Sequence, residues 1–286
     1  MPFLVLAGEF RIVGAEPDGD SIRFYPDDPS QWDDVGGTYA VQRNATGGAQ
    51  LRLDAIDALE THFAIPGGTA HQPLGLAHAA RDYLLTWLGF SSVTRSDSET
   101  VTATVPDGVR GYVLTRAADV YGRCIAFAGR GDAPAVSGGP VFVDAKLLRQ
   151  SANYRLLQRG LVYPTYYRKL FPDLRATFTA AVNQARPTRG VWPGDLTQSG
   201  LTVASLAQVE QDAIILPKLF RRLTTYLGMS DGDSSLAGFR AYLDQQDDRV
   251  YVMPDVHYTG LSTVVDVAGQ TVRLTVAAER LIFEEK

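Results

Sequence analysis

The sequence of 286 residues contains a single cysteine, Cys124, so the chain cannot form an internal disulfide bond. This composition is compatible with a reducing compartment. Long apolar runs are also missing: runs such as Ala213–Leu216 fall far short of the roughly 20 residues that a membrane-spanning helix needs. The segment Met1–Ala7 has no basic region and is followed at once by Glu9 and Arg11, which favours a strand over a secretory signal. We therefore expect a cytoplasmic protein that does not enter a membrane.

The sequence also lacks an excess of basic residues. Its 27 Lys and Arg are outnumbered by 32 Asp and Glu, which gives a net charge of −5. A protein that binds nucleic acid mainly by neutralising phosphates is normally basic, so a general DNA-coating protein is disfavoured. An enzyme is not excluded, because a small cationic site can bind one or two phosphates on an otherwise acidic surface. The hydrophobic fraction of 45% and charged fraction of 21% are typical of a globular protein.

The first two thirds of the chain predict strands first and helices later. Asp18–Asp20 is a turn signal, and Pro26–Gly48 has the Asp, Pro, Gly and Ser content of an inserted loop. Apolar residues recur at helical spacing over Pro73–Leu88, and alternating Thr and Val predict an exposed β-ribbon over Ser91–Val105. The other predicted strands are Phe3–Ala15, Ser21–Tyr25, Gln50–Asp57, Gly111–Arg116 and Arg123–Ala128, and the other predicted helices are Ala145–Gln158 and Asp173–Gln184.

A shift in composition near Thr197 predicts a domain boundary, with one domain over residues 1–196 and a second part over residues 197–286. About 90 residues can form a small core of their own. We therefore expect a C-terminal α+β module of unknown role, for which formation of a homo-oligomer and docking of a protein partner are the candidates.

The pattern of this C-terminal part is helical at first and strand-like later. Val203–Leu227 has helical spacing, which Pro217 should kink or interrupt. Arg249–Glu284 returns to strand-like alternation. Arg221 and Arg222 are expected on a solvated face of their helix.

Three short segments carry the residue types that phosphodiester hydrolysis requires. Such a reaction needs cations for the growing negative charge and a group that positions or deprotonates water, and a metal ion assists it. The turn Asp18-Gly19-Asp20 offers carboxylates, which suit a hard cation such as Ca²⁺. Arg52 and Arg123 offer planar forks that donate two bonds to a phosphate. Asp57 adds a carboxylate at the end of a predicted strand, and Glu60 follows three residues later.

Each of these features alone has a plainer interpretation. Asp-Gly is above all a turn signal, and Glu60 could belong to a surface helix with a solvated ion pair. His62 and His71 are interpreted as non-catalytic, and Cys124 as a small core residue rather than a nucleophile. The cluster Tyr163–Tyr167 could fill a core or stack on bases.

In this order, the three segments resemble the signature of the staphylococcal nuclease (thermonuclease) family: an Asp-Gly-Asp turn, an Arg-x₄-Asp-x₂-Glu stretch and a Tyr-Gly-Arg turn. The resemblance continues at Asn153–Leu161 and Pro187–Trp192 and covers about residues 8–195. It implies an α+β fold with a five-stranded OB-type β-barrel and three helices. It also implies a Ca²⁺-dependent nuclease that acts on DNA, with RNA as a second candidate substrate, and that breaks the bond between phosphorus and the 5′ oxygen.

The resemblance implies a metal site built from backbone and side-chain oxygens. Asp20 and Asp57 would bind Ca²⁺ directly, the backbone carbonyl of Ala58 would be a third ligand, and Asp18 would act through a water molecule.

The resemblance also implies the residues that contact the substrate. Glu60 would position or activate the attacking water, and Arg52 and Arg123 would stabilise the phosphorane-like transition state. Tyr121 would support the phosphate, and Tyr166 would stack on a base.

Two other functions stay open at this point. The barrel could be a non-catalytic module that binds nucleic acid or protein, or it could be the nuclease arm of a larger assembly whose partner docks beyond residue 197. The set Asp20, Arg52, Asp57, Glu60 and Arg123 favours the enzyme over the binding module, because a binding module has no need of all five.

Overall fold

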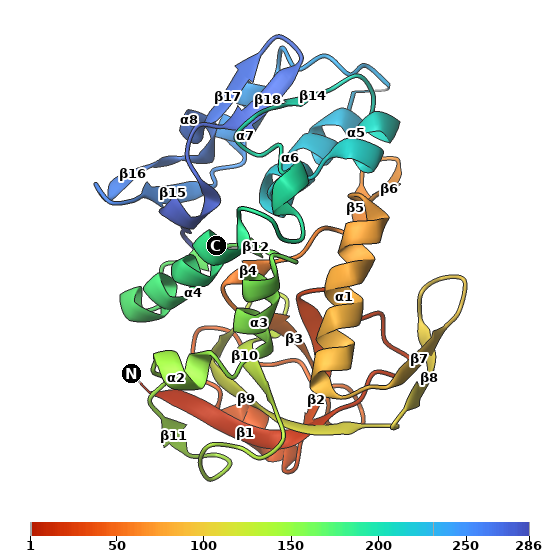
Figure 1. Ribbon diagram of the computed structural model, residues 1–286, viewed down its shortest axis with the longest axis vertical. Coiled ribbons are helices and arrows are strands. Elements are labelled where there is room, and N and C mark those ends of the chain that lie inside the picture. The colour runs from red at the N-terminus through yellow and green to blue at the C-terminus, as the bar shows by residue number, and fades with distance from the viewer. Residues whose placement is uncertain (1, 231, 286) are drawn as a thin grey trace. The chain divides into compact units, whose positions relative to one another are not determined.

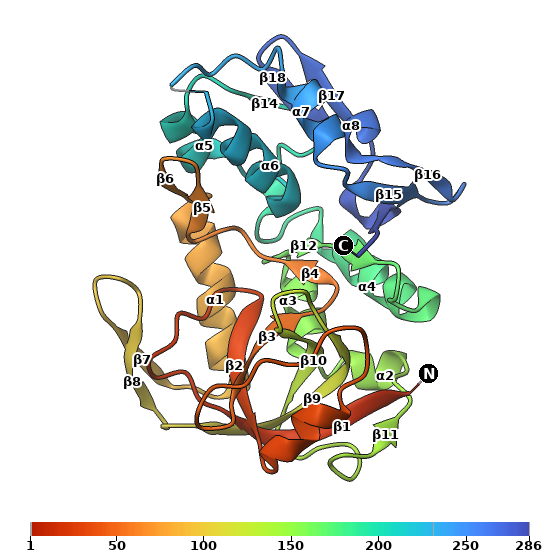
Figure 2. The same cartoon turned by 180° about the vertical axis from the view of Figure 1, so that it is seen from behind.

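The computed structural model describes residues 2–230 and 232–285. The chain forms two compact units, each made from two separate stretches. We call Met1–Asp54 with Ala80–Leu156 the barrel unit, and Ala55–Ala79 with Leu157–Lys286 the mixed unit. Figure 1 and Figure 2 show the helices and strands from opposite sides. Both kinds of element are present throughout, so the predicted α+β class is confirmed.

Five strands of the barrel unit close into a β-barrel of mixed direction. If the strands are numbered from first to fifth along the chain, their order around the barrel is first, second, third, fifth and fourth. The fourth strand also pairs with the first, which closes the barrel. The third and fifth strands run parallel, while the other neighbours run antiparallel. This barrel is consistent with the predicted OB type. Its strands are β1 (Phe3–Phe10), β2 (Ser21–Pro26), β3 (Ala49–Leu53), β9 (Val109–Ala118) and β10 (Cys124–Arg130), and the short β11 (Pro140–Val141) pairs with β1.

Alternation along the strands determines which side chains fill the barrel. In β3, Leu51 and Leu53 are fully buried while Arg52 is partly exposed, because successive side chains of a strand point to opposite faces. Gly8 lies where β1 pairs with β2 on one edge and with β9 on the other. A Cβ atom there would be 2.0 Å from the carbonyl oxygen of Tyr25, so this close approach requires glycine.

A hairpin and several helices complete the barrel unit. The predicted ribbon is confirmed as a hairpin of two strands, and the predicted helix over Pro73–Leu88 is confirmed with nearly the same bounds. The predicted helix over Ala145–Gln158 is instead two helices, because Ser151 forms a β-bridge with Gly129 between them. The elements are η1 (Pro29–Asp34), α1 (Leu74–Leu88), β7 (Ser92–Arg95), β8 (Val101–Val105), α2 (Ala145–Leu148) and α3 (Ala152–Arg159).

Asn153, at the start of α3, joins the helix to two strands of the barrel. Its side chain is fully buried. Its Oδ1 accepts a hydrogen bond from the backbone N–H of Ala128 (3.1 Å), and its Nδ2 donates to the carbonyls of Asp54 (2.8 Å) and Ala126 (3.1 Å). Three backbone groups at the ends of β3 and in β10 therefore depend on one amide.

We expect Asn153→Ala to lower the free energy of unfolding by about 3 kcal/mol, because it removes the three hydrogen bonds of a buried amide. Denaturant unfolding followed by circular dichroism measures the change. Asn183→Ala, at an exposed position of a later helix, is the control and should change stability by less than about 0.5 kcal/mol. An equally small effect of Asn153→Ala would contradict the role of this amide.

The mixed unit combines short strands with helices. Two larger sheets have the strand orders β13-β19-β15-β16 and β14-β18-β17, and two further strand pairs are β4–β12 and β5–β6. The strands are β4 (Ile56–Asp57), β5 (Phe63–Ile65), β6 (Gly68–Ala70), β12 (Tyr163–Pro164), β13 (Tyr166–Tyr167), β14 (Leu201–Thr202), β15 (Arg249–Val252), β16 (His257–Gly260), β17 (Val265–Ala268), β18 (Thr271–Leu274) and β19 (Leu281–Phe283). The helices are α4 (Pro172–Ala185), η2 (Trp192–Gly194), α5 (Leu206–Asp212), α6 (Pro217–Gly228), α7 (Phe239–Gln245), α8 (Leu261–Val264) and η3 (Ala278–Arg280).

Several contacts within the mixed unit join residues on both sides of position 196. Tyr166 pairs with Ile282 in parallel strands, and the Nη2 of Arg186 donates to Oε2 of Glu279 (2.6 Å). The backbone N–H of Leu196 donates to the carbonyl of Ile214. The domain limits 1–196 and 197–286 stay a prediction, and a chain cut at this point would lose these contacts.

Pro217 separates two helices where the sequence predicted one kinked helix. Helix α5 ends at Asp212 and α6 begins at Pro217 itself, a position that suits proline because the first helical N–H needs no partner within the helix. Among residues 2–230 and 232–285, no helix combines the length and the apolar character that crossing a bilayer requires.

Candidate functional site

The Asp-Gly-Asp turn immediately precedes β2 in the barrel unit. The Oδ1 atom of Asp18 accepts a hydrogen bond from the backbone N–H of Asp20 (3.0 Å). The backbone carbonyl of Asp20 accepts from the N–H of Leu53 (2.8 Å), at the end of β3. The turn is therefore attached to β3, the strand that carries Arg52, and the Asp20 residue is 8% exposed.

Arg52 lies on β3, and Arg123 directly precedes β10, the strand that pairs with β3 in parallel. Arg52 is paired with Ser21 on β2 and with Ile125 on β10. Arg123 directly precedes Cys124, which is buried inside the barrel opposite Leu51. The parallel pairing of β3 and β10 therefore places Arg52 beside Ile125, two residues further along the chain than Arg123.

Asp119 holds the turn that presents Arg123. Its Oδ2 accepts from the Nε of Arg123 (2.7 Å), and its Oδ1 accepts from the backbone N–H groups of Tyr121 (3.0 Å) and Arg123 (2.9 Å). Gly122 has a positive φ of 77°, which this tight turn requires. The ring of Tyr121 is 73% exposed and lies 5.6 Å from the guanidinium carbon of Arg123. The predicted support of a phosphate by Tyr121 is compatible with this exposure and stays a prediction.

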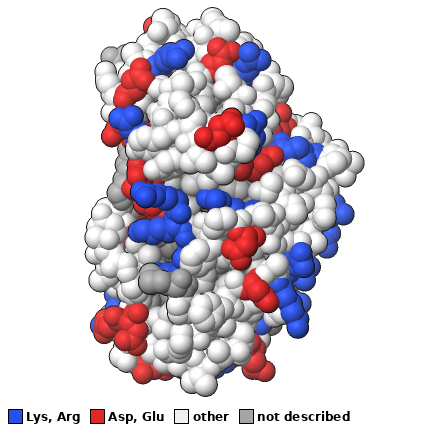
Figure 3. Space-filling model, turned by 90° about the vertical axis from the view of Figure 1, so that its left-hand side faces the viewer, with Lys and Arg blue, Asp and Glu red and all other residues white. Residues whose placement is uncertain are grey.

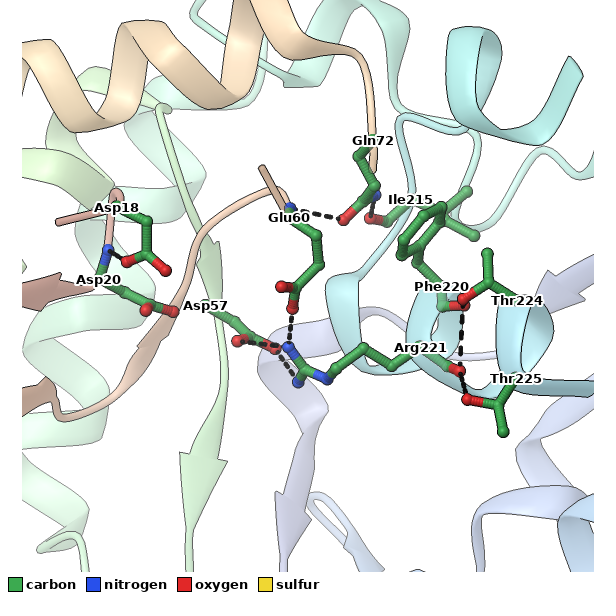
Figure 4. A network of polar contacts seen from close by, with 10 residues as sticks. All are labelled: Asp18, Asp20, Asp57, Glu60, Gln72, Ile215, Phe220, Arg221, Thr224 and Thr225. Atoms are coloured by element: carbon green, nitrogen blue, oxygen red, sulfur yellow. Dashed lines mark hydrogen bonds and ion pairs between the residues drawn. The ribbon is translucent and has the colours of Figure 1, made fainter. Parts of the chain in front are cut away.

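Asp57 and Glu60, which we call the acidic pair, lie in the mixed unit and share one arginine (Figure 4). Arg221 of α6 donates from Nη1 to Oδ1 of Asp57 (3.2 Å) and from Nη2 to Oδ2 of Asp57 (2.7 Å). Its Nη1 also donates to Oε1 of Glu60. One guanidinium thus bridges both carboxylates, with the two-bond geometry that a planar fork provides.

The acidic pair and Arg221 are poorly accessible to solvent. The exposed fractions of the side chains are 1% for Asp57, 16% for Glu60 and 22% for Arg221. Burial alone lowers the pKa of the Arg221 guanidinium, but the charges of Asp57 and Glu60 and their hydrogen bonds raise this pKa well above its ordinary value. Arg221 is therefore a permanent cation between two carboxylates.

Gln72 fixes the backbone beside Glu60. The backbone N–H of Glu60 donates to Oε1 of Gln72 (3.2 Å), and the backbone N–H of Gln72 donates to the carbonyl of Glu60 (2.8 Å). The Nε2 of this fully buried amide donates to the carbonyls of Ala213 (2.8 Å) and Ile215 (2.9 Å). These bonds attach Glu60 to the segment that leads into α6.

The sequence did not predict that Gln72 and Arg221 contact the acidic pair. The expectation that Arg221 and Arg222 lie on a solvated face is wrong, because each forms an ion pair in the mixed unit. Arg222 donates to both carboxylate oxygens of Asp248, at 2.6 and 3.0 Å. Helical spacing indicated where these side chains lie on α6, but nothing local in the sequence indicated their acidic partners.

Tyr166 lies in the core rather than on a surface. It is 1% exposed, and its hydroxyl is 3.0 Å from that of Thr179. No ring face is open for a base in this arrangement, so the predicted stacking role receives no support and stays a prediction. Cys124 is fully buried, as expected for a core residue, and burial raises the pKa of its thiol to about 12. A neutral thiol of this kind is a poor nucleophile.

The donors predicted for Ca²⁺ belong to both units. Asp18 and Asp20 are carboxylates in the barrel unit, and Asp57 and the carbonyl of the buried Ala58 are in the mixed unit. Within residues 2–230 and 232–285, no group of three or more His, Cys, Asp or Glu side chains is arranged to hold a metal ion. In the mixed unit, both carboxylate oxygens of Asp57 accept from Arg221. A metal ion at Asp57 would therefore share these oxygens with a guanidinium.

No protein-family model matches this chain, and neither does any curated protein sequence. The resemblance to staphylococcal nucleases therefore depends on the three sequence segments and on the strand order of the barrel. The face of the molecule in Figure 3 carries basic side chains near its left centre and along its right side, with acidic side chains beside them.

Proposed function

We propose that this protein hydrolyses phosphodiester bonds of DNA, with RNA as a second substrate, and that its barrel is of the staphylococcal-nuclease type. The observation that carries the proposal is the parallel pairing of β3, which contains Arg52, with β10, which Arg123 directly precedes. Two guanidinium forks can together donate to several oxygens of one phosphate. The Asp18–Asp20 turn is joined to β3 through the backbone carbonyl of Asp20.

The proposed reaction assigns a role to each residue through the family resemblance. Water adds its oxygen to phosphorus and gives a proton to Glu60, while the bond to the 5′ oxygen breaks and that oxygen takes a proton from solvent. Arg52 and Arg123 stabilise the charge that grows on the phosphoryl oxygens in the transition state. Glu60 orients the water before the attack.

A Ca²⁺ requirement is proposed from the resemblance alone. Asp18 and Asp20 supply the oxygen donors that Ca²⁺ prefers, and the metal would supply Lewis acidity at the phosphate. Asp57 is held by Arg221 through both of its oxygens. For this reason no step of the proposed reaction passes through a metal ion.

A second candidate function is a module that binds nucleic acid or protein without cleaving it. One observation favours it: Arg221 bridges Asp57 and Glu60, two residues that the hydrolytic reaction needs. A binding module could keep the arginines of the barrel as a phosphate site while the acidic pair serves only as a structural ion pair. Turnover distinguishes the two functions.

Incubation with single-stranded and duplex DNA and RNA, in Ca²⁺ or in excess chelator, tests the proposal. We expect cleavage in Ca²⁺, and we expect chelator or Asp20→Ala to remove the stimulation by Ca²⁺. Asp33→Ala is the control, because Asp33 pairs only with a surface arginine, Arg43, at an exposed site. Binding in a gel-shift assay without cleavage of any substrate would support the binding module instead. Undiminished cleavage in excess chelator would exclude the metal requirement.

A further inference from the structure

The position of Arg221 conflicts with the metal site that the resemblance implies. Its guanidinium donates to both oxygens of Asp57 and to Glu60. A divalent cation bound by Asp57 would need at least one of the same oxygens, since Ca²⁺ binds carboxylates at about 2.3–2.6 Å. A guanidinium and a metal ion therefore compete for this buried carboxylate, because both need its oxygens and their like charges repel.

The contact is more than an incidental ion pair of surface side chains. The Asp57 side chain is 1% exposed, whereas the surface pair Arg110–Asp27 has both side chains 49% exposed. Arg221 belongs to α6, whose Leu219, Phe220 and Leu223 are fully buried. The helix can therefore not slide away without moving core residues.

Gln72 holds the acidic pair close to the start of α6. It connects the backbone of Glu60 to Ala213 and Ile215, which lie just before this helix. The helix that carries Arg221 is therefore attached to the backbone of Glu60.

A second acidic group on the same helix provides a comparison. Asp248 accepts from Arg222 through both oxygens and also lies 3.4 Å from the Nζ of Lys218. Arg222 and Lys218 thus both pair with one carboxylate, and the family resemblance assigns no role to Asp248. At the acidic pair, by contrast, one guanidinium is an ion-pair partner of two carboxylates.

We propose that Arg221 is the resident cation of the acidic pair, and that it competes with divalent metal ions for Asp57 and Glu60. Arg221 then lowers the affinity of the acidic pair for divalent metal ions. For its effect on cleavage the inference rests on the proposed function, but metal binding itself does not depend on turnover.

Binding of Tb³⁺ and Ca²⁺ to the full chain tests the competition, by Tb³⁺ luminescence and by isothermal titration calorimetry. We expect Arg221→Gln to bind either ion at least ~10-fold more tightly than the unmodified protein, because a positive charge next to the carboxylates is removed. We also expect Ca²⁺ to raise the Tm of this variant more than that of the unmodified protein, because the ion replaces the lost charge. Adding Glu60→Gln to Arg221→Gln should reduce the gain.

Arg222→Gln is the matched control, one residue further along α6 and also in an ion pair, and its metal affinity should stay unchanged. If Arg221→Gln does not fold without metal, Arg221→Lys provides the same comparison, with a smaller gain of about 3-fold because lysine keeps the charge and loses the fork. Equal or weaker metal binding in the folded Arg221 variants would overturn the proposal. An equal gain in Arg222→Gln would also overturn it, by showing a general effect of charge. Absence of cleavage in every variant would contradict only the proposed function.

Discussion

Arg52→Lys should reduce the rate of DNA cleavage by about 10²-fold or more while leaving the barrel folded. Lysine keeps the positive charge but cannot donate two parallel bonds to a phosphate, and the lost bonds act on the charge that grows in the transition state. A factor of 10² corresponds to about 2.7 kcal/mol of activation free energy. Arg52 is partly exposed on the outer face of β3, so the slightly shorter lysine side chain fits without disturbing Leu51 or Leu53. Single-turnover cleavage of a short DNA measures the effect.

Arg110→Lys is the matched control for this substitution. Like Arg52, Arg110 is an arginine of the barrel unit. Its guanidinium donates two hydrogen bonds to the carboxylate of Asp27. It lies on β9, and it has no role in the proposed reaction. We expect its replacement to leave the cleavage rate within about 2-fold of the unmodified rate. Full activity in Arg52→Lys would contradict the assignment of Arg52 to the proposed phosphate site. Arg123→Lys provides the same test for Arg123.

Glu60→Gln should also reduce cleavage by at least ~10²-fold, because the amide cannot accept the proton of the attacking water. The substitution keeps the shape of the side chain and leaves Arg221 paired with Asp57, so we expect a folded protein. The reduction should appear in the rate of the chemical step and leave the affinity for DNA nearly unchanged. Quench-flow measurements at saturating protein separate the two quantities.

Glu279→Gln is the corresponding control. Glu279 is a glutamate of the mixed unit that pairs with an arginine, Arg186, and its side chain is 11% exposed, close to the 16% of Glu60. Its replacement should leave cleavage unchanged. Cleavage by Glu60→Gln at the unmodified rate would show that the water is activated by another group, and the pairing with Arg221 would then be the main role of Glu60.

The barrel and the long helix could be predicted because their signals are local. Alternation of apolar side chains marks β2, β3 and β10 within a few residues of their observed bounds, and helical spacing marks α1. Pro217 was harder to interpret, because proline both ends helices and favours their first turn. Only the neighbouring structure shows that here it begins α6.

The arginines and the acidic residues of the candidate site could be named from their order in the sequence. Their pairing could not, because it depends on contacts between distant segments. Arg221 is 164 residues from Asp57 and 161 residues from Glu60, and no pattern within a helix or strand indicates a partner at that distance. The same limit applies to Ala55–Ala79, which lies in the middle of the sequence of the barrel unit and belongs to the mixed unit.

The interleaved order of the two units has a consequence for folding during translation. Ala55–Ala79 leaves the ribosome before most of the barrel unit does, but its own unit includes α6, which ends at Gly228. The ribosome adds roughly 150 residues in between, which takes on the order of 10 s at about 5–20 residues per second. During this interval the carboxylates of Asp57 and Glu60 cannot pair with Arg221, because Arg221 has not been synthesised. The apolar residues of the segment also lack the core against which they pack. In the nascent chain, Ala55–Ala79 is therefore still unfolded, although the two sequence stretches on either side of it can already form the barrel. A chaperone or a pause in translation would act at this stage.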